Sequence, residues 1–156
     1  MGTRHTYRII ENYTWHSAGE TETSSEELLL LYGQYDGYPS GVPTQVAKFI
    51  AKGTMTNGYS TTDESIVFNG AGCMAAQLVA HLKDGVGTYY IHSLSSRGTC
   101  GEDYLYDIIV DHNEHSIVMV GYHNDEKRTE FFRGTPQEFI ASYAKEDLVE
   151  ITMSAN

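Results

Sequence analysis

The chain has 156 residues, of which 40% are apolar, and this size and composition allow one domain to build a hydrophobic core of its own. Ten lysines and arginines stand against 21 aspartates and glutamates, which gives a formal net charge of −11. Such a charge repels a phosphate backbone at long range, so it argues against non-specific binding of DNA or RNA. The net charge does not exclude binding of a small phosphorylated ligand, because a few locally placed arginines can hold one inside an acidic protein.

The sequence shows no membrane-spanning segment and no recognisable secretory signal. Its longest uninterrupted apolar run, Leu28 to Leu31, is far shorter than the roughly 20 residues that a membrane-spanning helix needs. The N-terminus has no basic segment followed by a long apolar region. Cys73 and Cys100 lack metal-type spacing, and an intracellular chain usually keeps thiols reduced. We therefore expect a cytoplasmic protein with no membrane contact, no metal site and no cofactor.

The first part of the chain predicts a β-hairpin with a long connection. Residues 3–13 are rich in β-branched and aromatic residues, and residues 28–32 form an apolar run of buried-strand length. The polar run 17–27 between them is expected to be a loop. Residues 33–43 are dense in Gly, Pro and Tyr and should stop the second strand.

Two helices separated by a long loop are predicted next. Pro43 is suited to open the first helix, and Gly53 to end it. Residues 54–69 are mostly polar, with an apolar patch at 66–68, so they are expected to form a loop. Residues 71–83 repeat apolar side chains at helical spacing, which makes this segment the clearest helix in the sequence.

The second half of the chain predicts four strands. Residues 103–111 and 116–122 are β-rich segments joined by a polar connection of hairpin length, and they form the strongest tertiary prediction. Residues 88–94 and 129–133 also have strand composition, and residues 95–102 between them should form a loop.

The end of the chain predicts a capped helix. Thr135 is placed to cap it, Pro136 occupies its first position, and Tyr143 lies at its end. Sequential strands with short connections, and helices that do not alternate regularly with them, favour an antiparallel sheet. The fold class expected is therefore α+β, a single domain over residues 1–156, with a mainly antiparallel sheet packed against about three helices.

Candidate ligand-binding residues gather in the Gly- and Tyr-rich segment 32–41. Its glycines and Pro39 allow a tight turn that presents side chains. On such a turn three tyrosines can form an aromatic wall with two polar contacts beside it: Tyr32, Tyr35 and Tyr38, with Gln34 and Asp36. An ordinary strand end, with packed tyrosines and a turn-capping Asp36, explains the same pattern equally well.

Two arginines are candidates for holding an anion. Arg4 lies early in the first strand, where it can meet Asp36 across the hairpin, and a structural ion pair is the simpler interpretation of that contact. Arg97 lies in the loop 95–103, whose Gly, Ser and Thr residues can turn backbone amides toward an anion. The loop lacks the Gly-Lys-Ser/Thr ending of a P-loop, and a solvated Arg97 is the alternative.

Catalytic and metal chemistry have weaker support. Cys100 with His92 and Asp103 supplies the residue types of a thiol nucleophile, its base and an orienting acid, but a packed structural cysteine is the simpler interpretation. His112 and His115 bracket a predicted turn without a known metal-binding spacing, and a solvated hairpin turn explains them better.

Three segments together resemble a known family. They are Met1-Gly-Thr-Arg-His5, Tyr32-Gly-Gln-Tyr-Asp-Gly-Tyr-Pro-Ser-Gly41 and the acidic-aromatic segment 100–111. The chain is similar in these segments to an uncharacterised group of phage, bacterial and fungal proteins with an N-terminal Met-Gly-Thr-Arg signature. Tyr35 stands where many members of that group have Trp. The resemblance implies shape and origin, and it brings no established activity.

Three functional hypotheses follow. The leading one is a module that binds a small, nucleotide-like or anionic ligand through Arg4, Arg97 and the segment 32–38; in a phage setting it would sequester a host immune signal. The second is a hydrolase that uses Cys100. The third is an acidic interaction protein that blocks a host partner. Exposed strands also allow a homo-oligomer.

Overall fold

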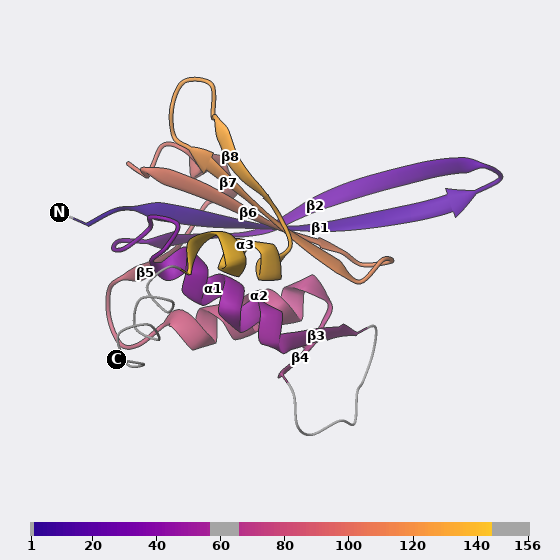
Figure 1. Ribbon diagram of the computed structural model, residues 1–156, viewed down its shortest axis with the longest axis horizontal. Coiled ribbons are helices and arrows are strands. Elements are labelled where there is room, and N and C mark those ends of the chain that lie inside the picture. Colours follow the sequence, from indigo (N-terminus) through magenta and orange to yellow (C-terminus); the bar gives the residue numbers. More distant parts are fainter. Residues whose placement is uncertain (1, 57–65, 145–156) are drawn as a thin grey trace, which may run out of the picture.

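The computed structural model describes residues 2–56 and 66–144. Six strands form one sheet in the order β5-β2-β1-β6-β7-β8, and three helices pack against one of its faces (Figure 1). The strands of this sheet are β1 His5–Ser17, β2 Glu20–Gly33, β5 Tyr89–His92, β6 Tyr104–Asp111, β7 Ser116–His123 and β8 Glu130–Gly134. The helices are α1 Val42–Lys52, α2 Gly70–Leu82 and α3 Pro136–Tyr143. The predicted α+β class with a mainly antiparallel sheet is confirmed.

The centre of the sheet is a parallel pair. β1 runs antiparallel to β2 but parallel to β6, with His5 opposite Tyr104 and Asn12 opposite Asp111. The remaining pairs within this sheet are antiparallel. The parallel pair places the start of the chain directly beside residues about a hundred positions later.

Alternation along the strands gives the sheet two different faces. Residues such as Tyr7, Leu31 and Tyr106 face the helices and form the main core with Met74 of α2 and Phe139 of α3. The opposite face carries the alternate residues. It combines a small buried apolar set with buried polar groups: Leu30, Leu105 and Val120, with Thr6 and Asp107.

The N-terminal hairpin differs from its prediction. Residues 17–27, expected to be a loop, mostly belong to β2, and a tight turn at Ala18 and Gly19 joins β1 to β2. Beyond Asn12, where pairing with β6 ends, residues 13–24 form a two-stranded ribbon that projects from the sheet (Figure 1). Because most of this ribbon is exposed, it carries no apolar alternation that would have identified it as a strand.

The predicted helices and the second hairpin are confirmed. α1 and α2 occupy the predicted segments, and Thr135 caps α3 by accepting a hydrogen bond from the Glu138 amide. β6 and β7 form the predicted antiparallel hairpin. The predicted loop 54–69 is partly wrong, because β3 Gly53–Thr56 and β4 Ile66–Asn69 pair in parallel. Residues 57–65 of that prediction lie outside the described residues.

His5 holds the start of β1 against the turn that follows β2. Its ring is fully buried, and its Nε2 donates to the Tyr35 carbonyl at 3.1 Å. Its buried Nδ1 has no hydrogen-bond partner among the described residues. Gly33 and Gly37 lie so close to the ring that a Cβ at either would collide with it. Burial lowers the pKa of His5 from 6.5 to about 4, and the Tyr35 hydrogen bond only partly opposes this shift.

We expect His5 to make the protein less stable as the pH falls from about 6.5 toward 4. In this window His5 is protonated in the unfolded state but stays neutral in the folded state. The free energy of unfolding therefore decreases as the pH falls, and His5 accounts for up to about 3 kcal/mol of that decrease. Urea unfolding of H5Q should show a smaller loss across the window than the exposed-histidine control H16Q. Equal losses in the two variants would contradict this account.

Candidate functional site

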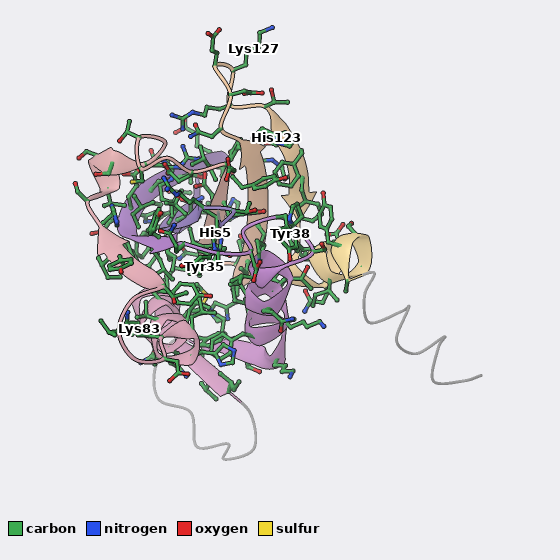
Figure 2. All side chains as sticks on the ribbon, turned by 90° about the vertical axis from the view of Figure 1, so that its left-hand side faces the viewer. His5, Tyr35, Tyr38, Lys83, His123 and Lys127 are labelled. Carbon is green, nitrogen blue, oxygen red and sulfur yellow. The ribbon has the colours of Figure 1, made fainter. Side chains whose placement is uncertain are left out.

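The three segments behind the family resemblance meet at one end of the sheet, which faces the viewer in Figure 2. Gly2 packs against the Gln34 carbonyl and the Tyr35 ring. The Gly37 amide donates to the Thr3 carbonyl at 2.9 Å, and the Tyr106 hydroxyl donates to the Gly37 carbonyl at 2.6 Å. Residues 2–5, 32–41 and 100–106 therefore form one structural unit.

A hollow of about 220 Å³ opens within this unit and is lined by Gly2, Arg4, Gly101 and Asp103. Gly101 has a φ of 79°, and a Cβ there would lie 2.7 Å from Arg4 Nη1. Asp103 accepts a hydrogen bond from the Arg4 backbone amide at 3.2 Å. The hollow thus combines one guanidinium group with one carboxylate.

Arg4 does not form the expected ion pair with Asp36. Among the residues that the structure describes, no carboxylate lies within ion-pair distance of the Arg4 guanidinium. Asp36 instead has a φ of 58°, and its carbonyl accepts the Val42 amide at the start of α1. Asp36 shapes the turn through its backbone, and the Arg4 side chain turns toward Gly101.

The tyrosines of the segment 32–41 have different environments. Tyr32 is buried, its ring lies 5.0 Å from the His92 ring, and its hydroxyl donates to Gln34 Oε1 at 2.7 Å. Burial raises the pKa of Tyr32, and the nearby Arg4 charge opposes that rise. Tyr35 and Tyr38 are 53% and 38% exposed. Tyr35 borders the hollow through its contact with Gly2.

The loop 95–103 does turn backbone amides toward an anion, but that anion belongs to the protein. The amides of Gly98 and Cys100 each donate to the Glu102 carboxylate at 2.7 Å, and the Thr6 hydroxyl donates to it at 3.0 Å. Glu102 is only 4% exposed. These amides are occupied, so they do not form the anion site that the sequence suggested.

Arg97 is mostly buried, and its partners are Asp107 and Tyr122. Its guanidinium lies 3.3 Å from the carboxylate of Asp107 and 5.3 Å from the centre of the Tyr122 ring. Arg4 lies against Gly101, whereas Arg97 contacts Asp107 and Tyr122. No contact among the described residues therefore supports the prediction that both arginines bind one ligand.

Cys100 and His92 come together, with 3.4 Å between Sγ and Nδ1. The thiol also donates to the Ser96 carbonyl at 3.1 Å. Burial, and secondarily the Glu102 charge, raise the pKa of Cys100, which favours the unreactive thiol over the thiolate. Asp103 contacts the Arg4 amide, so it does not orient His92 in the way that the hydrolase hypothesis needs.

In the turn between β6 and β7, His112 contacts residues of β1. His112 lies 4.0 Å from Glu11 and its ring packs against Tyr13. Within residues 2–56 and 66–144, no group of three or more His, Cys, Asp or Glu side chains is arranged to hold a metal ion. In the same part of the chain, no helix has the length and apolar character to cross a membrane.

Comparisons with protein-family models, with curated proteins and with solved structures found no match. The family resemblance therefore stays a prediction, and the geometry carries the functional argument.

Sequence reasoning missed Glu102 and Asp107 as organising residues. Both are acidic residues in a chain with many, and their roles depend on contacts with Thr6 and Arg8, which β1 brings from the start of the chain. The one available signal was the pair of glycines at 98 and 101, which marked the loop as a tight turn.

Replacing Glu102 by Gln should destabilise the protein by about 2 kcal/mol, because the neutral amide loses charge-assisted bonds and turns one donor group toward backbone donors. Urea unfolding measures this change, and E126Q on the exposed β7–β8 turn is the matched control. Amide hydrogen exchange at Gly98 and Cys100 should accelerate in E102Q alone. Unchanged stability and exchange would contradict the role assigned to Glu102.

Proposed function

We propose that the protein binds a small, nucleotide-like anionic ligand in the hollow between Arg4 and Gly101. The observation that carries this proposal is a guanidinium group without a carboxylate partner among the described residues, placed in a concave site of a protein with a net charge of −11. In so acidic a chain, an arginine left without a carboxylate partner supports a role in holding an external anion.

The size of the hollow indicates which part of a ligand it takes. Its volume of about 220 Å³ lies below the roughly 300–1,000 Å³ of a site that encloses a whole drug-sized ligand. A phosphate group fits beside Arg4, and the Asp103 carboxylate can accept a hydroxyl hydrogen of an attached sugar. The exposed Tyr35 ring offers a surface on which a base can stack.

The resemblance to phage proteins suggests one candidate ligand, a nucleotide-derived immune signal of a host cell. A hydrolase that uses Cys100 is less well supported. The 3.4 Å contact with His92 favours it, but the raised pKa of the thiol and the engagement of Asp103 with Arg4 argue against it.

A thermal-shift titration with AMP, ADP and pyrophosphate tests the proposal. A ligand at a hundred times its dissociation constant stabilises the folded state by about 2.7 kcal/mol, so a saturable rise in Tm is expected. R4Q should lose this rise, and R133Q, which removes an equal charge from the exposed pair with Glu130, should keep it. The proposal fails if no compound shifts the wild-type Tm, or if both variants lose the shift equally.

A second candidate function, an acidic interaction protein, has one specific observation in its favour. The projecting ribbon of residues 13–24 carries exposed Glu20 and Glu22, and the sequence holds no lysine or arginine between Arg8 and Lys48. Trp15, the single tryptophan, is 50% exposed on this ribbon. An exposed aromatic side chain among like charges suits a partner with a basic surface.

A deca-lysine peptide is a suitable probe for this second function, because Trp15 fluorescence reports binding near the ribbon. We expect salt-dependent binding that weakens about fivefold in the double variant E20Q/E22Q. The control D84N/E126Q removes the same charge from exposed sites elsewhere. If the control weakens binding as much as the ribbon variant, the ribbon is not the binding surface.

A further inference from the structure

The sheet face opposite the helices holds a cluster of arginines around one buried carboxylate. Asp107 is 2% exposed and is shared by two guanidinium groups, with Arg8 Nη2 at 2.7 Å and Arg97 Nη2 at 3.3 Å. Arg8 has a second partner, because its Nη1 lies 2.8 Å from Glu27. Arg8 therefore contacts two carboxylates, whereas Arg97 contacts only Asp107 among the described carboxylates and shares it with Arg8.

A third guanidinium group reaches the cluster from the β7–β8 turn. The backbone of Arg128 has a φ of 50°, and its amide donates to the Asp125 carbonyl at 3.2 Å. The Asp125 carboxylate accepts the amide and the hydroxyl of Thr129, at 2.9 and 2.6 Å. The Arg128 guanidinium folds back against Gly98, next to Arg97 in the chain.

Arg128 brings to this face a positive charge that has no ion-pair partner of its own among the described residues. Among residues 2–56 and 66–144, no carboxylate forms an ion pair with the Arg128 side chain. Burial lowers the pKa of Arg97, Asp107 opposes this, and the charges of Arg8 and Arg128 lower it further. The side chain of Arg97 is 16% exposed, and its buried Nε has no hydrogen-bond partner in the part of the chain that the structure describes.

Arg128 packs against Gly98, and its charge acts on Arg97. Like charges that interact in this way repel each other unless an anion lies between them. Phosphate is the anion that arginine binds best, because its oxygens match the planar fork of N–H donors. Tyr122 supports the arrangement by packing its ring under the Arg97 guanidinium. Backbone hydrogen bonds hold the turn that carries Arg128.

We propose that Arg97 and Arg128 form an oxyanion site for a phosphate group on the sheet face opposite the helices. This site uses other side chains than the hollow beside Arg4 and does not depend on the function proposed for that hollow. The same chemistry serves a free phosphate ion and the phosphoryl group of a larger molecule.

The test is a titration of ¹⁵N-labelled protein with inorganic phosphate and, in parallel, with AMP, at an ionic strength kept constant with sodium chloride. The readout is the Nε–H resonance of Arg97, which burial protects from exchange with water. Phosphate should shift this resonance to saturation. Tighter binding of AMP would assign the site to a phosphoryl group on a larger ligand, and equal binding would assign it to the free ion.

R128Q should weaken phosphate binding about tenfold, as expected for the loss of one charge-assisted contact. K127Q is the matched control, because it removes the same charge from the neighbouring residue at the tip of the turn, which points away from the sheet (Figure 2). R4Q separates this site from the hollow beside Arg4. The proposal is overturned if no saturable shift occurs, if K127Q weakens binding as much as R128Q, or if only R4Q weakens it.

Discussion

The parallel pairing of β1 with β6 is the constraint on which the rest of the structure depends. It sets Thr6 beside Leu105 and Arg8 beside Asp107. The start of the chain thereby supplies hydrogen-bond and ion-pair partners to the buried carboxylates of Glu102 and Asp107. Thr6 contacts Glu102, and Arg8 contacts Asp107. Both carboxylates are almost fully buried, and burying a charge without such partners would cost several kcal/mol. The candidate sites lie where this pairing begins.

The two buried carboxylates have different partners: Glu102 binds backbone amides, and Asp107 binds arginine side chains. Glu102 accepts hydrogen bonds from backbone amides, which closes the loop 97–102, and Arg4 lines the hollow without forming an ion pair to a described carboxylate. Asp107 pairs with Arg8 and Arg97. In a protein with a net charge of −11, the two sites that we propose would be small regions that favour anions. Most of its exposed ribbon instead repels them.

Local signals predicted much of the fold, and long-range contacts account for what was missed. Apolar spacing in α2, the Thr135 cap of α3 and the β6–β7 hairpin are encoded by neighbouring residues, so sequence patterns found them. The ribbon 13–24 was missed because an exposed pair of strands needs no apolar alternation. The parallel β1–β6 pair has no local signature. For the site, sequence analysis found Arg4 and Arg97 but could not show that they face different surroundings.

The most direct test of the central claim is an amide chemical-shift map of ¹⁵N-labelled protein titrated with ADP. The account predicts saturable changes at residues 2–4 and 101–103, which line the hollow, and at residues 34–36, which contact Gly2, because these segments form one unit. Changes confined to the ribbon 13–24, or no saturable change at any amide, would contradict it.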